Sequence, residues 1–386
     1  MTLDHETRQH LERCRSSLPS SAPQAPVVFG FDGVVDRVRT VVAERTGPEQ
    51  FERMTSLEEF GSRITDSAAL DASCSIEWFE RGTRPGGHVS HLGRAFERLG
   101  ATPTLVGTFG EPPVEAFREE YDRARLVSIG EPSTTDAIEF DDGKVMLSDS
   151  GRLSTLDWGT LREAVGLEDL AEHVDRSAAM GTGYWSTVPR LPTIWRGLAD
   201  DLWPVLSDPP RAVLVDPGDV RRLGDDRRSG LDELSALDRA VPVTVSANRP
   251  ECDELAAMCG IADPLASLSS LAGELHERLG VSRFVGHSVS TATVATADGT
   301  ASVSVPRCPD PVLTTSAGDH FNAGLLLAHR CDVRGGAALV VANALAGWFV
   351  RTGRPPTYDE LREFVDEYDE QFEGESESKS IDPSDG

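Results

Sequence analysis

Residues 314–324 read Thr-Thr-Ser-Ala-Gly-Asp-His-Phe-Asn-Ala-Gly and run directly into the apolar stretch Leu-Leu-Leu-Ala at 325–328. Small residues precede an acid, and a helix-like apolar pattern follows at once. The first backbone N–H groups of a helix lack partners within the helix and its dipole is positive there, so the pattern is typical of an anion site. Asp319 would lie in the first helical turn, where a carboxylate can accept the proton of an attacking hydroxyl in phosphoryl transfer. The same residues also fit an ordinary helix start whose acid complements the dipole.

The bulk composition restricts the possible partners. The chain has 386 residues, 39% of them hydrophobic, which suits one large α/β unit with an appended segment. Its net charge is −27, and its only lysines are Lys144 and Lys379. Such an acidic surface repels nucleic acid and anionic membranes, so we expect neither as a partner. The acid bias predicts a halophilic source, because salt screens the self-repulsion of the chain.

Cysteine usage and the absence of apolar runs predict a cytoplasmic location. The six cysteines include no Cys-x-x-Cys pair, and they are interpreted as free thiols. The N-terminal residues are charged and helix-like, with no apolar core of a signal peptide. No run of about 18 apolar residues occurs, so no membrane-spanning helix is expected.

The order of apolar runs and helical patterns predicts an α/β fold. Residues 1–26 are expected to form a helical extension and a linker, residues 27–372 the main domain, and residues 373–386 a disordered acidic tail. Strands and helices alternate through the main domain, which predicts a mostly parallel sheet with helices on both faces. The expected strands are Val27–Phe31, Thr104–Val106, Ala212–Asp216, Val243–Ser246 and Arg283–Val285; the clearest helices are His88–Leu99, Asn322–Ala328, Gly336–Val350 and Tyr358–Tyr368.

One region breaks this rhythm and predicts a small β-lid. Two short strands, Thr135–Phe140 and Lys144–Ser148, flank an Asp-Asp-Gly turn, which is a hairpin signal. Together with residues 34–85, which include an expected strand Ser73–Trp78, the hairpin would form a lid from about 34–85 and 131–150. An exposed lid edge would also offer a surface for a homodimer.

Acids follow the first expected strand in the sequence Gly-Phe-Asp-Gly-Val-Val-Asp at 30–36. Ligands in open α/β sheets bind beyond the carboxyl ends of the strands. Asp32 and Asp36 are therefore candidates for hydrogen bonds to sugar hydroxyls. The alternative is that Asp32 only forms the turn with Gly33.

A second candidate is the helix start Pro-Gly-Gly-His-Val-Ser-His at 85–91. Gly86 and Gly87 would allow a close approach of the backbone, and His88 and His91 share one helix face. We expect these four residues to bind a substrate. Plain helix capping and a metal site are the alternatives, although no carboxylate close in sequence completes a ligand set.

A third candidate lies after the strand Val243–Val245. Asn248 and Glu251 would lie at a helix start, where Glu251 can order a water molecule on Mg²⁺. A capping box formed by Asn248 or Ser246 with Glu251 is the rival interpretation. Further candidates for contact with a nucleotide are Gly286, His287 and Asn343.

Taken in order, these motifs resemble the ribokinase-like (PfkB) carbohydrate kinases over roughly residues 27–370. The Gly-Gly helix start followed by Ala95, Leu99 and Gly100 resembles the first signature of that family. Residues 315–324 resemble the second, Thr-Gly-Ala-Gly-Asp-x-Phe-x-Ala-Gly, with Ser316 in place of the first glycine. The chain is most similar to a branch with Gly-Phe-Asp-Gly-x-x-Asp near the start and Glu-Phe-x-Asp-Gly-Lys in the lid.

The resemblance implies transfer of the γ-phosphate of ATP to a hydroxyl of a sugar-like substrate, with Mg²⁺. It implies Asp319 as the base and an anion hole formed by Ser316, Ala317 and Gly318. The residues that would hold the substrate are Asp32, Asp36, Gly86, Gly87, His88 and His91. Those that would serve the nucleotide and the metal are Asn248, Glu251 (through water), Gly286, His287 and Asn343.

Two departures from the family pattern keep alternatives open. His91 replaces an asparagine of the first signature, so the substrate need not be a common pentose or hexose. Leu313 replaces an aspartate that helps to bind potassium in the family, which leaves activation by monovalent cations open. An ADP-dependent sugar kinase of the same fold and a catalytically silent protein that binds a sugar or nucleotide are the alternative functions.

Overall fold

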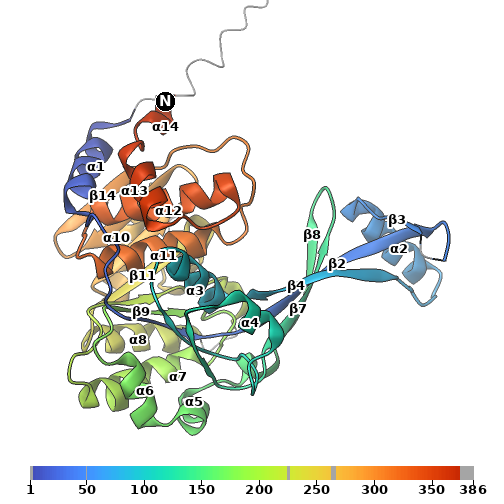
Figure 1. Ribbon diagram of the computed structural model, residues 1–386, viewed down its shortest axis with the longest axis horizontal. Helices are drawn as coiled ribbons and strands as arrows, with labels where there is room; N and C mark the ends of the chain where they lie inside the picture. Colours follow the sequence, from blue (N-terminus) through green and yellow to red (C-terminus); the bar gives the residue numbers. More distant parts are fainter. Residues whose placement is uncertain (1–2, 49, 224–226, 262–266, 374–386) are drawn as a thin grey trace, which may run out of the picture.

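The computed structural model describes residues 3–48, 50–223, 227–261 and 267–373, and it confirms the predicted α/β class (Figure 1). A nine-stranded sheet has the order β14-β13-β12-β11-β10-β9-β1-β5-β6. All neighbouring strands from β11–β12 to β5–β6 are parallel, whereas the pairs β12–β13 and β13–β14 are antiparallel. In that order, the strands are Gly299–Ser304, Thr291–Thr296, Arg283–His287, Val243–Asn248, Val213–Val215, Ala179–Gly183, Val27–Phe31, Thr104–Gly107 and Arg125–Ser128.

Helices cover both faces of this sheet, because its central strands are apolar on both sides. All five residues of β1, Val-Val-Phe-Gly-Phe, are buried, which is typical of a parallel strand between two helical layers. One face carries α1 (His5–Ser17), α3 (His88–Arg98), α4 (Glu115–Glu120), α11 (Ala317–Arg330), α12 (Gly336–Thr352), α13 (Tyr358–Asp366) and α14 (Glu370–Glu373). The other carries α5 (Trp158–Val165), α6 (Leu167–Val174), α7 (Leu191–Gly197), α8 (Arg227–Asp238), α9 (Arg249–Met258) and α10 (Leu268–Leu279).

Four short helical turns complete the main body: Gly151–Ser154, Leu198–Leu202, Trp203–Val205 and Val220–Arg222. The expected helical extension packs into the main core, since Leu11 and Cys14 of α1 are buried there. The acidic tail expected at 373–386 lies outside the described residues from Gly374 on. Among the residues that are described, no helix is long and apolar enough to cross a membrane.

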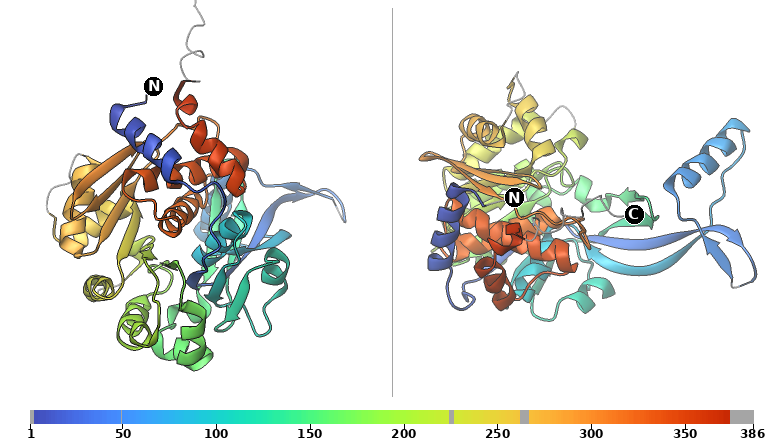
Figure 2. Two further views of the ribbon diagram at one scale, coloured as in Figure 1. Left: turned by 60° about the vertical axis from the view of Figure 1, so that its left-hand side comes forward. Right: turned by 90° about the horizontal axis from the view of Figure 1, so that it is seen from above.

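A second sheet occupies both expected lid segments and extends away from the main body as an arm (Figures 1 and 2). Its order is β3-β2-β7-β8, and β4 pairs with β2. The arm also carries α2, and a small core of its own contains Met54, Phe60 and Phe140. The bounds are β2 Val34–Arg45, β3 Phe51–Arg53, α2 Leu57–Ala69, β4 Trp78–Gly86, β7 Ser133–Glu139 and β8 Lys144–Asp149.

One expected strand is wrong. The sequence predicted a strand over Ser73–Trp78, whereas β4 begins at Trp78 and ends at Gly86. The strand is set by antiparallel pairing with β2, which matches Val34 with Gly86 and Val41 with Trp78. Most side chains of β4 are exposed, so the segment has no apolar alternation from which its position can be predicted.

Helices α11 and α12 approach each other closely at Gly324. A Cβ atom added at Gly324 would lie 2.5 Å from the Cα atom of Ala342, which is backbone and cannot move aside easily. The last glycine of the 314–324 stretch is therefore required by packing between two buried helices.

We expect Gly324→Ala to lower the free energy of unfolding by about 1–3 kcal/mol, since the core is overpacked. The matched control is Gly273→Ala in α10, where the added Cβ would meet only Thr300 Cγ2 at an ordinary 3.7 Å. That change should be neutral or stabilise by about 0.4–1 kcal/mol. Urea unfolding of both variants in molar KCl measures the difference, and equal stability of the two would contradict the packing argument.

Candidate active site

The helix start that the sequence predicts before Asp319 is present as the first turn of α11. Ser316 has φ of 70° and directly precedes the helix, which begins at Ala317. The backbone N–H groups of Ala317 and Gly318 therefore belong to the first turn, together with the Asp319 carboxylate. His287, at the end of β12, lies next to this turn, because its Cε1 atom would be 3.8 Å from a Cβ atom on Gly318.

Asp319 is buried and receives two hydrogen bonds on the same oxygen. His88 Nδ1 lies 2.9 Å from Asp319 Oδ1, and the Tyr184 hydroxyl donates to that oxygen too. Burial alone would raise the pKa of Asp319, but His91, His88 and Tyr184 outweigh it and lower the pKa to about 2. The carboxylate is therefore ionised and fixed in orientation, as a general base requires.

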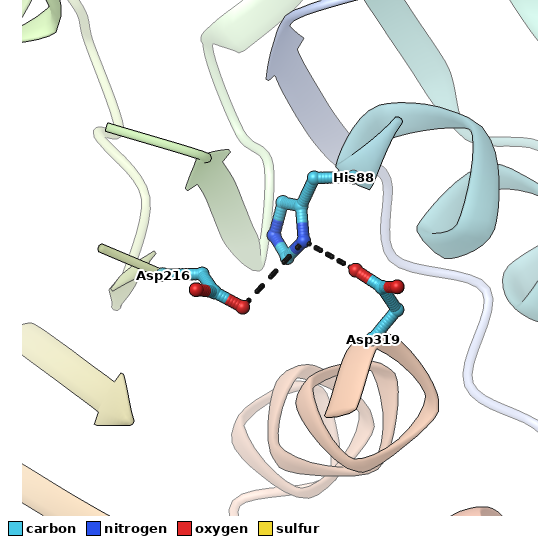
Figure 3. A group of neighbouring side chains, drawn as sticks. All are labelled: His88, Asp216 and Asp319. Atoms are coloured by element: carbon cyan, nitrogen blue, oxygen red, sulfur yellow. Dashed lines mark hydrogen bonds and ion pairs between the residues drawn. The ribbon is translucent and has the colours of Figure 1, made fainter. Parts of the chain in front are cut away.

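A second buried acid, Asp216, follows β10 and approaches His88 from the other side (Figure 3). Its Oδ2 atom accepts a hydrogen bond of 2.7 Å from Asn322 Nδ2 and lies 3.9 Å from His88 Nδ1. Its Oδ1 atom accepts a hydrogen bond of 2.8 Å from the backbone N–H of Gly218. His88, Asp216 and Asp319 thus come from three separate elements and place one possible metal-ligand atom each within 4.8 Å of the others.

Carboxyl groups outnumber basic side chains around this cluster. Burial raises the pKa of Asp216 to about 8; His88 opposes this shift, whereas Glu251 and Asp319 add to it. Burial likewise raises the pKa of Glu251, with smaller contributions from other carboxylates including Asp319. Carboxylates that disfavour one another's charge are stabilised by a cation, and oxygen ligands suit Mg²⁺. The residues present therefore fit a magnesium ion.

The paired glycines before α3 leave room for two carboxylates. A Cβ atom on Gly86 would lie 2.5 Å from Asp36 Oδ2, and one on Gly87 would lie 2.7 Å from Asp32 Oδ2. Asp32 uses both oxygens to accept the backbone N–H groups of His88 and Val89, at 2.8 and 2.9 Å. Asp32 therefore caps α3, which is neither the sugar contact nor the turn with Gly33 expected from the sequence, while Asp36 projects from β2 against Gly86.

His91 links α3 to the anion loop. Arg94 Nη1 lies 3.1 Å from His91 Nδ1, and Ser316 Oγ lies 2.9 Å from His91 Nε2. Since a guanidinium only donates, Nδ1 must accept, and Nε2 carries the proton donated to Ser316. Burial lowers the pKa of His91 to about 3, so the ring is neutral. The protein itself thus occupies both ring nitrogens of this expected substrate ligand.

Asn248 and Glu251 form the capping box that was the rival interpretation. The Glu251 backbone N–H donates to Asn248 Oδ1 at 3.0 Å, and the Asn248 backbone N–H donates to Glu251 Oε2 at 2.8 Å. Capping does not remove Glu251 from the site, because its charge acts on Asp216. Gly286 packs against Leu268 and Cys252 at the end of β12, beside His287.

Asn343 does not join this group. Its side-chain amide is buried and donates to the Tyr368 hydroxyl at 3.1 Å, and that hydroxyl donates to the backbone carbonyl of Ser304. This hydrogen bond connects α12 to Tyr368, which follows α13. In the structure Asn343 therefore makes a packing contact and not the expected nucleotide contact.

Three residues of the site were missed from the sequence. Asp216 is the last residue of the expected strand Ala212–Asp216, so the rule that ligands gather at carboxyl ends of strands was sufficient to identify it. Asn322 lies within the quoted 314–324 stretch and was passed over. Tyr184 follows β9, a strand that the sequence did not predict, and no motif marks it.

Solved structures with the same fold are kinases. Ribokinase from Arabidopsis thaliana, complexed with ribose and ATP, matches with a TM-score of 0.59 and 17% identity, covering 89% of this chain and 99% of that one. A nucleoside kinase from Burkholderia thailandensis matches with a TM-score of 0.57 and 15% identity, covering 88% of this chain and 100% of that one. These likenesses place the chain in the ribokinase fold.

The sequence comparisons define the family within this fold. The family model of prokaryotic ketohexokinase matches residues 3–368. A ketohexokinase from Haloferax volcanii is 50% identical over 373 residues, which cover 96% of this chain and 99% of the relative. The chain belongs to the prokaryotic ketohexokinase family. It is therefore an ATP-dependent carbohydrate kinase, as the motifs implied, and its acidic composition agrees with a relative from Haloferax.

Proposed function

We propose that the chain transfers the γ-phosphate of ATP to a hydroxyl of a ketohexose, with Asp319 as the general base. The observation that carries this proposal is the ionised Asp319, held by His88 and Tyr184 at the start of α11. The name of the Haloferax relative, ketohexokinase, supports the choice of a six-carbon keto sugar.

In the proposed reaction the two carboxylate oxygens of Asp319 have different roles. The sugar hydroxyl oxygen attacks the γ-phosphorus, the bond from that phosphorus to the bridging oxygen breaks, and ADP leaves. His88 and Tyr184 both engage Asp319 Oδ1, so we assign Oδ2 to the hydroxyl whose proton is taken. The N–H groups at residues 316–318 would face the phosphoryl oxygens, where the helix dipole stabilises negative charge.

The substrate is assigned to the region beside the two glycines. Because Asp32 is committed to capping α3, we assign the sugar hydroxyls to Asp36, and to Gly86 and Gly87 through close backbone approach. The nucleotide is assigned to the ends of β11 and β12, with Gly286 and His287 as its nearest expected contacts. Magnesium, when bound, would neutralise charge on the phosphates, with Glu251 holding it through water and Asp216 close by.

Asp319→Asn should lower kcat at least about 10³-fold, because the variant keeps the shape of the side chain and loses its basicity. A coupled assay of ADP release measures turnover, run in molar KCl with Mg²⁺ on fructose, aldohexoses, pentoses and nucleosides. Asp298→Asn, in the exposed turn between β13 and β14, is the matched control and should keep wild-type activity. Wild-type turnover by Asp319→Asn, a nucleoside as the best substrate, or ADP as a better donor than ATP would overturn the proposal.

Glu251→Gln should raise the Mg²⁺ concentration for half-maximal activity by about tenfold and leave folding intact. Glutamine at this position preserves a capping box but loses the charge, which separates the two roles of Glu251. The control is Glu360→Gln in the capping box of α13, which should leave the Mg²⁺ dependence unchanged. An unaltered Mg²⁺ requirement in Glu251→Gln would leave Glu251 with its capping role alone.

We also propose that the arm forms a homodimer surface. The arm exposes large apolar side chains, with Leu70 79%, Ile64 43% and Trp78 43% exposed. A sheet edge with such neighbours can pair with the same edge of a second copy.

Leu70→Asp combined with Trp78→Asp should convert a dimer to a monomer in light scattering at molar KCl. Val289→Asp, equally apolar and 91% exposed away from the arm, should leave the mass unchanged. A monomeric wild type would refute the dimer.

A further inference from the structure

Lys144 is the one lysine in the described ranges, and it lies at the start of β8 in the lid. We propose that Lys144 is a catalytic residue: the lid delivers its ammonium group to the phosphoryl group in transfer. This inference rests on the proposed function, and it adds a residue that has no role in the reaction as proposed above.

The contact that carries the inference crosses from the lid to the anion loop. Lys144 Nζ donates a hydrogen bond of 2.6 Å to Thr315 Oγ1. Thr315 directly precedes Ser316, at which the anion hole begins. The positive charge of the lid thus already lies at the edge of the site to which the phosphoryl oxygens are assigned.

The same ammonium group also acts on the carboxylate assigned to the sugar. Burial raises the pKa of Asp36, and the charges of Arg84, Lys144 and Arg94 oppose this shift. Lys144 is therefore within electrostatic reach of Asp36 on one side and in contact with Thr315 on the other. The acceptor hydroxyl and the donor phosphate must meet between these two residues.

The turn before Lys144 is tied firmly into the arm. Asp142 Oδ1 accepts the backbone N–H of Leu57 at 2.7 Å, and Asp142 Oδ2 accepts the Ser56 hydroxyl at 3.0 Å. Arg53 forms an ion pair with Asp141 in the same turn. Since the arm and the turn are connected in this way, any displacement of the arm carries Lys144 with it.

The residue type fits the task. Nearly all the basic residues of this chain are arginine, whose planar fork suits a fixed carboxylate or phosphate. A lysine is a compact charge with three rotatable donors, so it can follow a phosphoryl group from donor to acceptor.

In the proposed step, the Lys144 ammonium leaves Thr315 and hydrogen bonds to the oxygens of the transferring phosphoryl group. It neither gains nor loses a proton: the hydroxyl proton goes to Asp319, the new O–P bond forms and the bridging bond breaks with departure of ADP. Its contribution is stabilisation of charge in the transition state.

Lys144→Met tests the inference, since methionine keeps the unbranched stem and loses the charge. We expect kcat to fall about 100-fold or more while the Kd for ATP changes less than about threefold, because the contact forms in the transition state. Inhibition by ADP with aluminium fluoride, a mimic of that state, should weaken by a similar factor. Lys144→Arg should restore part of kcat.

Two further variants separate the catalytic role from a structural one. Arg53→Met removes a positive charge from the same hairpin contact region and should keep kcat within about twofold, as a surface pair contributes little. If Lys144 merely held the loop through Thr315, Thr315→Val would reproduce the full loss; we expect it to lower kcat less than about fivefold, because it removes one neutral hydrogen bond.

The outcomes distinguish this inference from the proposed function. Wild-type kcat in Lys144→Met, together with an inactive Asp319→Asn, would overturn the role of Lys144 and leave the kinase mechanism intact. A full loss in Thr315→Val would also overturn it, in favour of a structural role. A wild-type protein without turnover on any sugar would refute both proposals together.

Discussion

The site depends on keeping the Asp319 carboxylate ionised although it is buried. Burial alone favours the protonated acid, and the pKa falls to about 2 only because His88 and Tyr184 bond the same oxygen and His91 lies close by. These partners come from two separate segments of the chain. His88 and His91 begin α3, whereas Tyr184 follows β9. The parallel order of the strands brings these segments to one edge, and the chemistry follows from that order.

Close backbone approach is the second constraint, and it explains why glycine recurs in the motifs. Gly86 and Gly87 make room for the carboxylates of Asp36 and Asp32, which a Cβ atom would meet at 2.5 and 2.7 Å. Asp32 then fixes the start of α3 and with it the direction of His88, whose backbone N–H it accepts. Gly324 lets α12 pack against α11, which carries Asp319, the proposed base. The motifs thus combine a chemical requirement with a packing requirement.

The sequence predicts those parts of the molecule that depend on interactions between residues close together in the chain. The helix start at Ala317 and the place of Asp319 in its first turn follow from small residues before an acid, and β1 follows from an unbroken apolar run. What the sequence does not reveal depends on distant partners. Tyr184 reaches Asp319 across 135 positions of the chain, and β4 exists because β2 pairs with it. The contact between His91 and Ser316 spans 225 positions and leaves no local sequence pattern. The sequence therefore predicts a substrate contact for His91, whereas the structure shows the ring bonded to the protein itself.

A chain with a net charge of −27 must still bind ATP, which is itself a polyanion. Salt screens the long-range repulsion, but it screens long-range attraction equally, so the positive groups have to touch the phosphates. The start of α11 provides partial positive charge from its backbone N–H groups, without a basic side chain. Lys144 adds a full charge from the lid at the same place, through Thr315. In the proposed mechanism this charge is carried by the lid, so phosphoryl transfer would depend on the position of the lid through one side chain.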